Sequence, residues 1–110
     1  MDDHVVVLAV RIARLLQEEA KVDAGHWQIG KPYFIRTVTH HLTGRLVAVT
    51  QHELWLEDAA WIADDGRFMQ AIEKAEFAEV EPFPSDRRVA VGRGSLIDAV
   101  EISSVQRNQK

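Results

Sequence analysis

Apolar residues recur every three to four positions through the first part of the chain, which is the pattern of an amphipathic helix. The residues with this spacing are Val5, Leu8, Ile12, Leu15 and Leu16. They predict a helix over residues 4–20, with Asp2 or Asp3 as its N-terminal cap and Gly25 as a stop signal. Further apolar residues widen the stripe: Val6, Val7 and Val10. Two interpretations stay open, because such a helix either packs on its own domain alone or also contacts a neighbouring subunit.

After Gly30 the pattern changes, because aromatic and β-branched residues replace the helical spacing. Five strands are predicted, over residues 33–39, 45–50, 53–57, 88–91 and 95–102. Residues 40–44 have the composition of a turn, and the third strand continues weakly through residues 59–62. The strands together predict a barrel over residues 33–102.

The segment between the third and fourth strands has helical spacing instead. Its apolar positions are Phe68, Met69, Ile72 and Ala75. They predict a short helix capped by Asp64 or Asp65. Pro82 and Pro84 mark an exposed connection, and residues 104–110 read as a flexible, frayed tail.

Composition narrows the class of protein. The 110 residues are 46% hydrophobic and 27% charged, which fits a single domain over residues 1–110. The chain has no cysteine, which excludes disulfide frameworks and thiolate chemistry and suits a cytoplasmic location. No stretch approaches the roughly 18 to 20 apolar residues of a membrane span, so we expect no membrane contact. The formal net charge of −4 argues against a generally basic surface for nucleic acid.

One helix followed by five strands predicts a mostly β fold, namely a small, bent, SH3-like barrel with an N-terminal helix. Residues 44–58 resemble the first motif of Sm and Lsm proteins, in which a glycine opens a bent strand and an apolar strand ends in acidic residues. Residues 89–97 resemble the second motif, in which an Arg-Gly turn joins the last two strands. The predicted helix over residues 4–20 stands where Sm-like proteins carry theirs.

The chain also resembles short uncharacterised proteins of phages and bacteria, for which no function is implied. The residues that carry this resemblance are Arg36-Thr37, Gly44-Arg45-Leu46 and Asp58-Ala59-Ala60-Trp61. It suggests a phage-derived or bacterial particle as the setting of the protein.

The resemblance to Sm proteins implies a homo-oligomeric ring, in which the fourth strand of one copy pairs with the fifth strand of the next. An open barrel leaves residues 88–91 and 96–102 as two unpaired edges, and a head-to-tail ring satisfies the backbone groups of both. The interface would contain Val89, Val91, Leu96, Ile97, Val100 and Ile102. The alternative is a monomer whose edges are protected by Asp98, Glu101 and the tail.

RNA binding, the usual task of Sm proteins, carries over only in part. The resemblance implies that the side chains contacting RNA would be His52, Arg93, Arg87 and Arg88. Thr50 stands where the family has an aspartate, and Glu53 stands where it has an asparagine. A carboxylate in place of an amide removes hydrogen-bond donors and repels phosphate. An ordinary solvated turn histidine is the alternative interpretation of His52.

Other chemistry is weakly indicated. His40, His41, His52 and Glu53 could form a metal site only if two turns met, and adjacent histidines on a strand point to different sides. The acidic pairs Glu57-Asp58 and Asp64-Asp65 match a strand end and a turn better than a calcium loop. No serine has the sequence context of a nucleophile. We therefore expect no metal, no cofactor and no enzymatic activity.

Trp55, Trp61 and Phe68 are expected to anchor the core or an interface. The function predicted from the sequence is a non-enzymatic, ring-forming assembly or scaffold module. The alternatives are a small RNA-binding Sm-type regulator and a monomeric adaptor domain.

Overall fold

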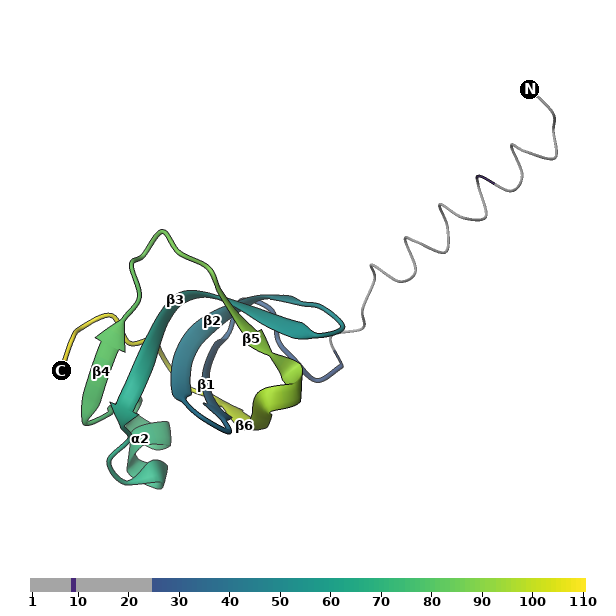
Figure 1. Cartoon of the computed structure of the whole chain (residues 1–110). Helices are drawn as coiled ribbons and strands as arrows, with labels where there is room; N and C mark the ends of the chain where they lie inside the picture. Colours follow the sequence, from purple (N-terminus) through teal and green to yellow (C-terminus); the bar gives the residue numbers. More distant parts are fainter. Residues whose placement is uncertain (1–8, 10–24) are drawn as a thin grey trace.

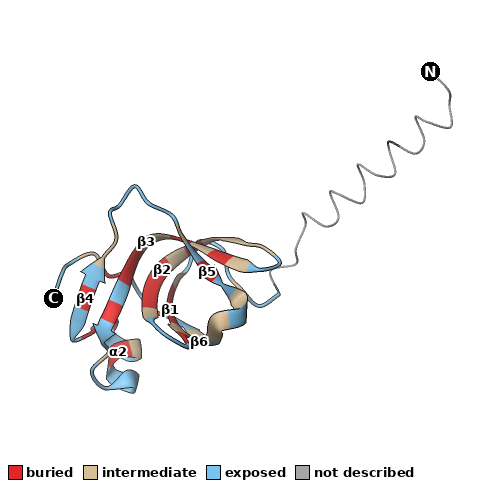
Figure 2. Cartoon of the chain, in the orientation of Figure 1, coloured by how far each residue is buried: buried red, intermediate tan, exposed pale blue. Residues whose placement is uncertain are grey.

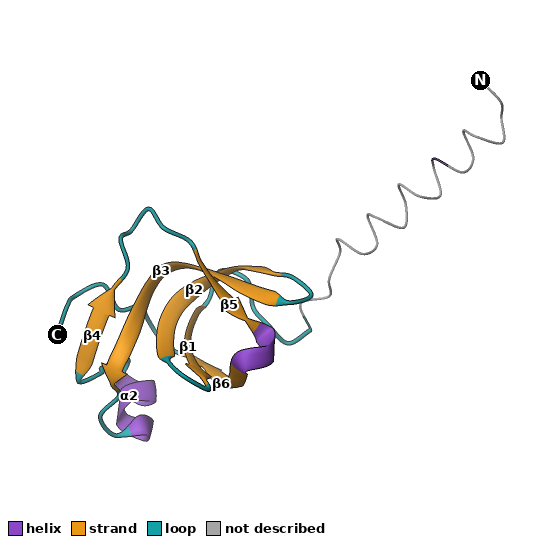
Figure 3. Ribbon diagram, viewed as in Figure 1, coloured by secondary structure: helices purple, strands orange, loops and turns teal. Residues whose placement is uncertain are grey.

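The computed structural model describes residue 9 and residues 25–110. Six strands, one α-helix and one 3-10 helix form this part of the chain (Figures 1 and 3). Their bounds are β1 Pro32–Thr37, β2 His41–Val49, β3 Glu53–Asp64, α2 Phe68–Lys74, β4 Glu79–Pro82, β5 Val89–Gly92, η1 Arg93–Ser95 and β6 Leu96–Glu101. The helix predicted over residues 4–20 lies, apart from Ala9, outside the described residues.

All strand pairs are antiparallel, and the sheet order is β4-β3-β2-β1-β6. β5 pairs with the first half of β3, at residues 53–56, while β4 pairs with its second half, from Ala60 to Asp64. A mostly β fold is therefore confirmed. The sheet is open and has six strands rather than the predicted five.

β3 changes faces at Asp58, which has a positive φ of 50°. Aspartate tolerates this left-handed conformation better than most residues. Before this point Leu54 and Leu56 pack into one core, whereas after it Ala60 and Ile62 pack into another. The extra residue is a β-bulge, because it shifts the pairing of β3 with β2 and reverses which positions face each core.

The two cores lie on opposite sides of β1, whose successive residues alternate between them. Figure 2 marks the buried residues of the strands in red. Tyr33 and Ile35 belong to the first core, together with residues of β2, β3 and β5. Phe34 belongs to the second core, to which α2 and β4 also contribute residues. Phe77 and Val80 belong to the same core. Burial on both faces explains why β1 reads as a continuous apolar run.

The prediction of a turn over residues 40–44 is wrong, because β2 begins at His41 and runs through Gly44. The turn lies earlier, where the amide of His40 donates to Thr37 Oγ1 (2.9 Å) and that hydroxyl donates to the carbonyl of His40 (2.7 Å). A glycine fits this position of β2 because β3 approaches the backbone closely there. A Cβ at this position would lie 3.0 Å from Cβ of Leu56.

The short helix is confirmed, but its predicted cap is wrong. The N-cap is Arg67, with no side-chain hydrogen bond. Asp64 Oδ1 instead accepts the amide of Gly66 (2.9 Å), and Asp65 Oδ2 lies 2.8 Å from Nδ1 of His41. The two carboxylates are thus used by the preceding turn and by β2.

The connection expected around Pro82 and Pro84 contains a strand, β4, which ends at Pro82. The charged residues around Val80 hide it in the sequence, because only one of its four residues is buried. The prediction of an exposed connection is therefore wrong at Pro82, which ends β4, but confirmed at Pro84, which is exposed and lies between β4 and β5.

The C-terminal segment packs against the domain, in contrast to the predicted frayed tail. Gln106 is only 8% exposed, and its Nε2 donates to the carbonyl of Ala75 (2.6 Å). Lys110 and Val80 exchange two backbone hydrogen bonds, of 3.0 and 3.2 Å. Arg107 donates to the carbonyls of Ala59 (3.1 Å) and Phe83 (2.9 Å). Polar side chains hold this segment, which the hydrophobic pattern alone does not reveal.

Candidate functional site

β5 and β6 each have one side without a strand partner among the described residues. β5 pairs with β3 alone and β6 with β1 alone, and η1 joins them (Figure 1). The amide of Arg93 donates to the carbonyl of His52 (2.8 Å), and that of Ile102 donates to the carbonyl of Pro32 (3.0 Å). Amide directions alternate along an antiparallel strand, so the amides of Ala90 and Ala99 point away from the sheet. We call these sides the outer edges of β5 and β6.

The predicted interface residues fall into three groups. Ile97 and Val100 are exposed, at 58% and 36%. Val89 and Leu96 are half-buried and pack against the first core. Val91 and Ile102 are buried in the first and second cores, so their side chains are not available to a neighbour. For these last two residues, only the backbone can take part in the interface, which stays a prediction.

The structure places His52 and Arg93, two of the predicted RNA contacts, next to each other. Besides the backbone bond between them, Arg93 Nη1 donates to the carbonyl of Thr50 (2.8 Å). Thr50 closes the same turn, since its amide donates to the carbonyl of Glu53 (2.9 Å). His52 is exposed at the tip of this turn. Part of the hydrogen-bonding capacity of Arg93 is thus used inside the protein.

Arg87 and Arg88 lie at the other end of β5 and do not join that pair. Arg88 Nε donates to Glu57 Oε1 (3.1 Å), and Arg87 Nη1 lies 3.4 Å from Asp86 Oδ2. Both cations therefore face carboxylates of the same chain. The four predicted RNA contacts therefore lie in two separate pairs, one at each end of β5, and do not form one basic surface.

A pocket of about 210 Å³ lies between α2 and β6. The Arg36 guanidinium lies 5.0 Å from the centre of the Phe68 ring and forms two hydrogen bonds with Asp98, one of them 2.7 Å from Nε to Oδ1. This hydrogen bonding lowers the pKa of the Asp98 carboxyl below its ordinary value and raises the pKa of Arg36. Because the two charges satisfy each other, the pocket has no free charge of its own.

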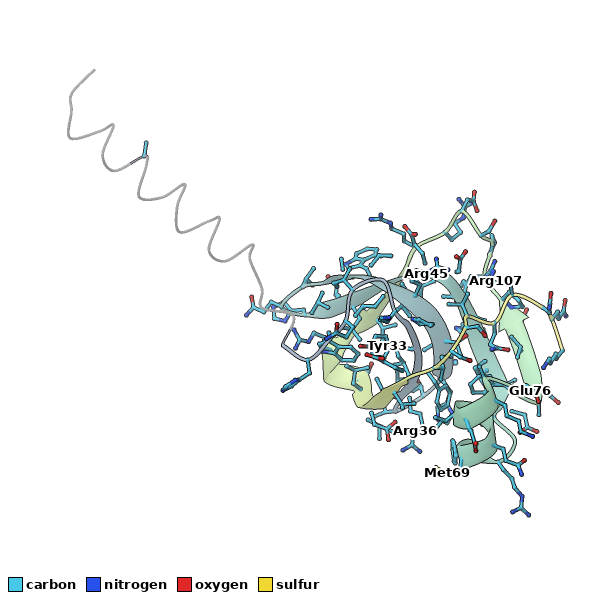
Figure 4. The ribbon with its side chains drawn as sticks, turned by 180° about the vertical axis from the view of Figure 1, so that it is seen from behind. Tyr33, Arg36, Arg45, Met69, Glu76 and Arg107 are labelled. Carbon is cyan, nitrogen blue, oxygen red and sulfur yellow. The ribbon has the colours of Figure 1, made fainter. Side chains whose placement is uncertain are left out.

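The sequence did not reveal this ion pair, since Arg36 and Asp98 are 62 positions apart. They are direct partners in the pairing of β1 with β6, so only the strand register brings them together. Figure 4 shows Arg36 beside Met69, which belongs to α2 and lines the same pocket.

The histidines do not meet. His41 is the first residue of the nine-residue strand β2, and His52 lies in the turn beyond the other end of that strand. His40 stacks on Trp61 with ring centroids 5.1 Å apart. No group of three histidine, aspartate or glutamate side chains gathers in the described part of the chain.

Within residue 9 and residues 25–110, no helix combines the length and apolar character needed to cross a bilayer. In comparisons with known proteins, no family model, no curated protein and no solved structure matches the chain. The geometry of the chain itself therefore carries the functional argument.

Proposed function

We propose that the protein is a non-enzymatic assembly module, which forms a homo-oligomeric Sm-like ring by pairing the outer edge of β5 with the outer edge of β6 of the next copy. The single observation that carries this proposal is that β5 and β6 each have an outer side with no strand partner among the described residues. β4 is a third edge strand, but the backbone of Lys110 already bonds to Val80 on its outer side. Unpaired backbone amides and carbonyls form a template for another strand. Two different edges on one molecule favour a heterologous, head-to-tail contact.

Two further features support the proposal. Ile97 and Val100 expose apolar surface on β6, and a neighbouring copy would remove it from water. The Sm-like segments 44–58 and 89–97 are also neighbours, because β3 and β5 pair from Glu53↔Gly92 to Leu56↔Val89.

Light scattering of the full chain tests this function. We expect a mass several times 12.5 kDa at micromolar concentration. Ala90→Pro should reduce it to 12.5 kDa, because proline removes an outward amide while the hydrogen bonds between β3 and β5 remain. Ala90→Ser retains the amide and should assemble as the parent does.

A monomeric parent chain contradicts the proposal. A Pro variant that keeps both its fold and its assembly also contradicts it, and circular dichroism checks the fold. Should Ala90→Pro unfold, Gly92→Pro repeats the test, because the φ of Gly92 is −65° and suits proline.

The proximity of His52 and Arg93 favours a second candidate function, binding of single-stranded RNA. Fluorescence anisotropy with labelled oligo-A and oligo-U at about 100 mM salt tests it. Micromolar binding that Arg93→Ala and His52→Ala both abolish would favour the RNA-binding regulator over the scaffold. Glu53 and the formal charge of −4 predict no such binding.

A further inference from the structure

A second pocket lies at the other end of the sheet from β6, where β3 and β4 pair. Its volume is about 180 Å³, and its lining residues are Trp61, Glu81, Pro82, Phe83 and Pro84. Trp61 and Glu81 are direct partners in the strand register, so their side chains stand on the same face. Trp61 is 44% exposed, which is unusual for so large an apolar side chain.

Two rings contact Trp61. The ring of Phe83 is nearly perpendicular to the indole, at 85°, with centroids 5.6 Å apart. His40, which lies just before β2, stacks on the indole at 25° and so holds Trp61 in place. Aromatic faces carry negative electrostatic potential, and tryptophan attracts cations most strongly.

The charge of the pocket points the same way. Glu81 is exposed, and its carboxylate has no hydrogen-bond or ion-pair partner in the described part of the chain. No cationic side chain lines the pocket. An unpaired carboxylate beside the exposed ring of Trp61 and the half-buried ring of Phe83 fits a cation with an apolar body. A metal ion fits less well, because one carboxylate supplies too few oxygen ligands.

The pocket is also held in shape before any ligand arrives. The amide of Phe83 donates to the carbonyl of Ala59 (2.8 Å), and its own carbonyl accepts from Arg107 Nη2 (2.9 Å). Pro82 and Pro84 flank Phe83 and restrict the backbone further. A site with a fixed geometry loses little conformational entropy on binding.

We propose that this pocket binds a compact organic cation of the quaternary ammonium class. The cationic head lies against Trp61 and Phe83, and Glu81 supplies the opposite charge. This proposal does not rest on ring assembly, because no residue that lines the pocket belongs to β5 or β6.

The test titrates the full chain with choline chloride at constant ionic strength and follows the indole Nε1–H signal of Trp61 by NMR, assigned through Trp61→Phe. We expect saturable shifts at that signal. The uncharged isostere 3,3-dimethylbutan-1-ol should cause much smaller shifts, since it has the same shape without the charge. Equal shifts with both compounds, or none with choline, would overturn the proposal.

Two matched variants isolate the carboxylate. Glu81→Gln should weaken choline binding about threefold or more, because it removes the charge and preserves the size of the side chain. Glu79→Gln removes the same charge from the same strand. Glu79 lies opposite Asp64 in the strand register and does not line the pocket. This variant should change the affinity less than about twofold, and equal losses in both variants would contradict the assigned role of Glu81.

Replacement of the indole supplies a further check. Trp61→Leu should weaken binding by about two- to thirtyfold, which is the range expected for loss of a cation–π contact. The signal of a nearby backbone amide then replaces the indole signal. N-acetyl-trimethyllysine methylamide tells whether the group arrives on a free small molecule or on a modified side chain. Binding of choline alone assigns the site to a free small molecule, whereas binding of both compounds shows that a modified side chain also fits.

Discussion

Gly44 lies inside β2 at the point where Leu56 of β3 leaves no room for a side chain. Gly44→Ala would place a Cβ 3.0 Å from Cβ and 3.1 Å from Cδ1 of Leu56, which is fully buried. Such overpacking typically costs about 1–3 kcal/mol. We therefore expect urea denaturation to show a free energy of unfolding lower by about that amount.

Gly92→Ala is the control, because a Cβ at Gly92 meets nothing within 4 Å. It should leave the stability nearly unchanged. If Gly44→Ala proves as stable as Gly92→Ala, the close approach of β2 and β3 at Leu56 is not a constraint on the fold.

Asp58 is the other residue on which the architecture depends, because its left-handed conformation exchanges the faces of β3. Arg45 Nη1 donates to its Oδ2 (2.7 Å), and Arg107 Nε lies 4.0 Å from its Oδ1. Figure 4 labels both arginines on this side of the sheet. The sequence predicts a strand on each side of Asp58 but not the bulge, because the bulge follows from pairing with β2.

The C-terminal segment is the element that sequence patterns describe least well. It has few apolar residues, so its order depends on hydrogen bonds to Ala59, Ala75, Val80 and Phe83. Truncation after Val105 removes all of these contacts. At about 0.5–1.5 kcal/mol each, their loss should lower the free energy of unfolding by a few kcal/mol.

Thermal and urea unfolding of the truncated chain test this expectation. Gln106→Ala separates one contact from the rest and should lose only about 1 kcal/mol. A truncated chain as stable as the parent would mean that this segment is a free tail, as the sequence alone suggests.

Local patterns nevertheless predicted several elements well. The spacing around Ile72 identified α2, and β-branched or aromatic residues identified β1, β5 and β6. β4 escaped because its alternation is only four residues long and ends in Pro82. The pockets around Arg36 and around Trp61 were not predicted, for a different reason. The neighbours of these two residues come from strands far away in the sequence, which only the sheet register specifies.

At the scale of the whole molecule, the proposed ring depends on two edges that differ in sequence and can complement each other. Ala90→Pro blocks the outer edge of β5 and leaves that of β6 free, whereas Ala99→Pro does the reverse. Neither variant should pair with itself. A mixture offers one free edge of each kind, so it should form a closed-ended dimer and no ring.

The mass of that mixture, measured by light scattering, tests the proposed assembly most directly. The account predicts 12.5 kDa for each variant alone and about twice that mass for the mixture. The controls Ala90→Ser and Ala99→Ser keep their amides and should form the large assembly. If both Pro variants fold but their mixture remains at 12.5 kDa, head-to-tail pairing of β5 with β6 is contradicted.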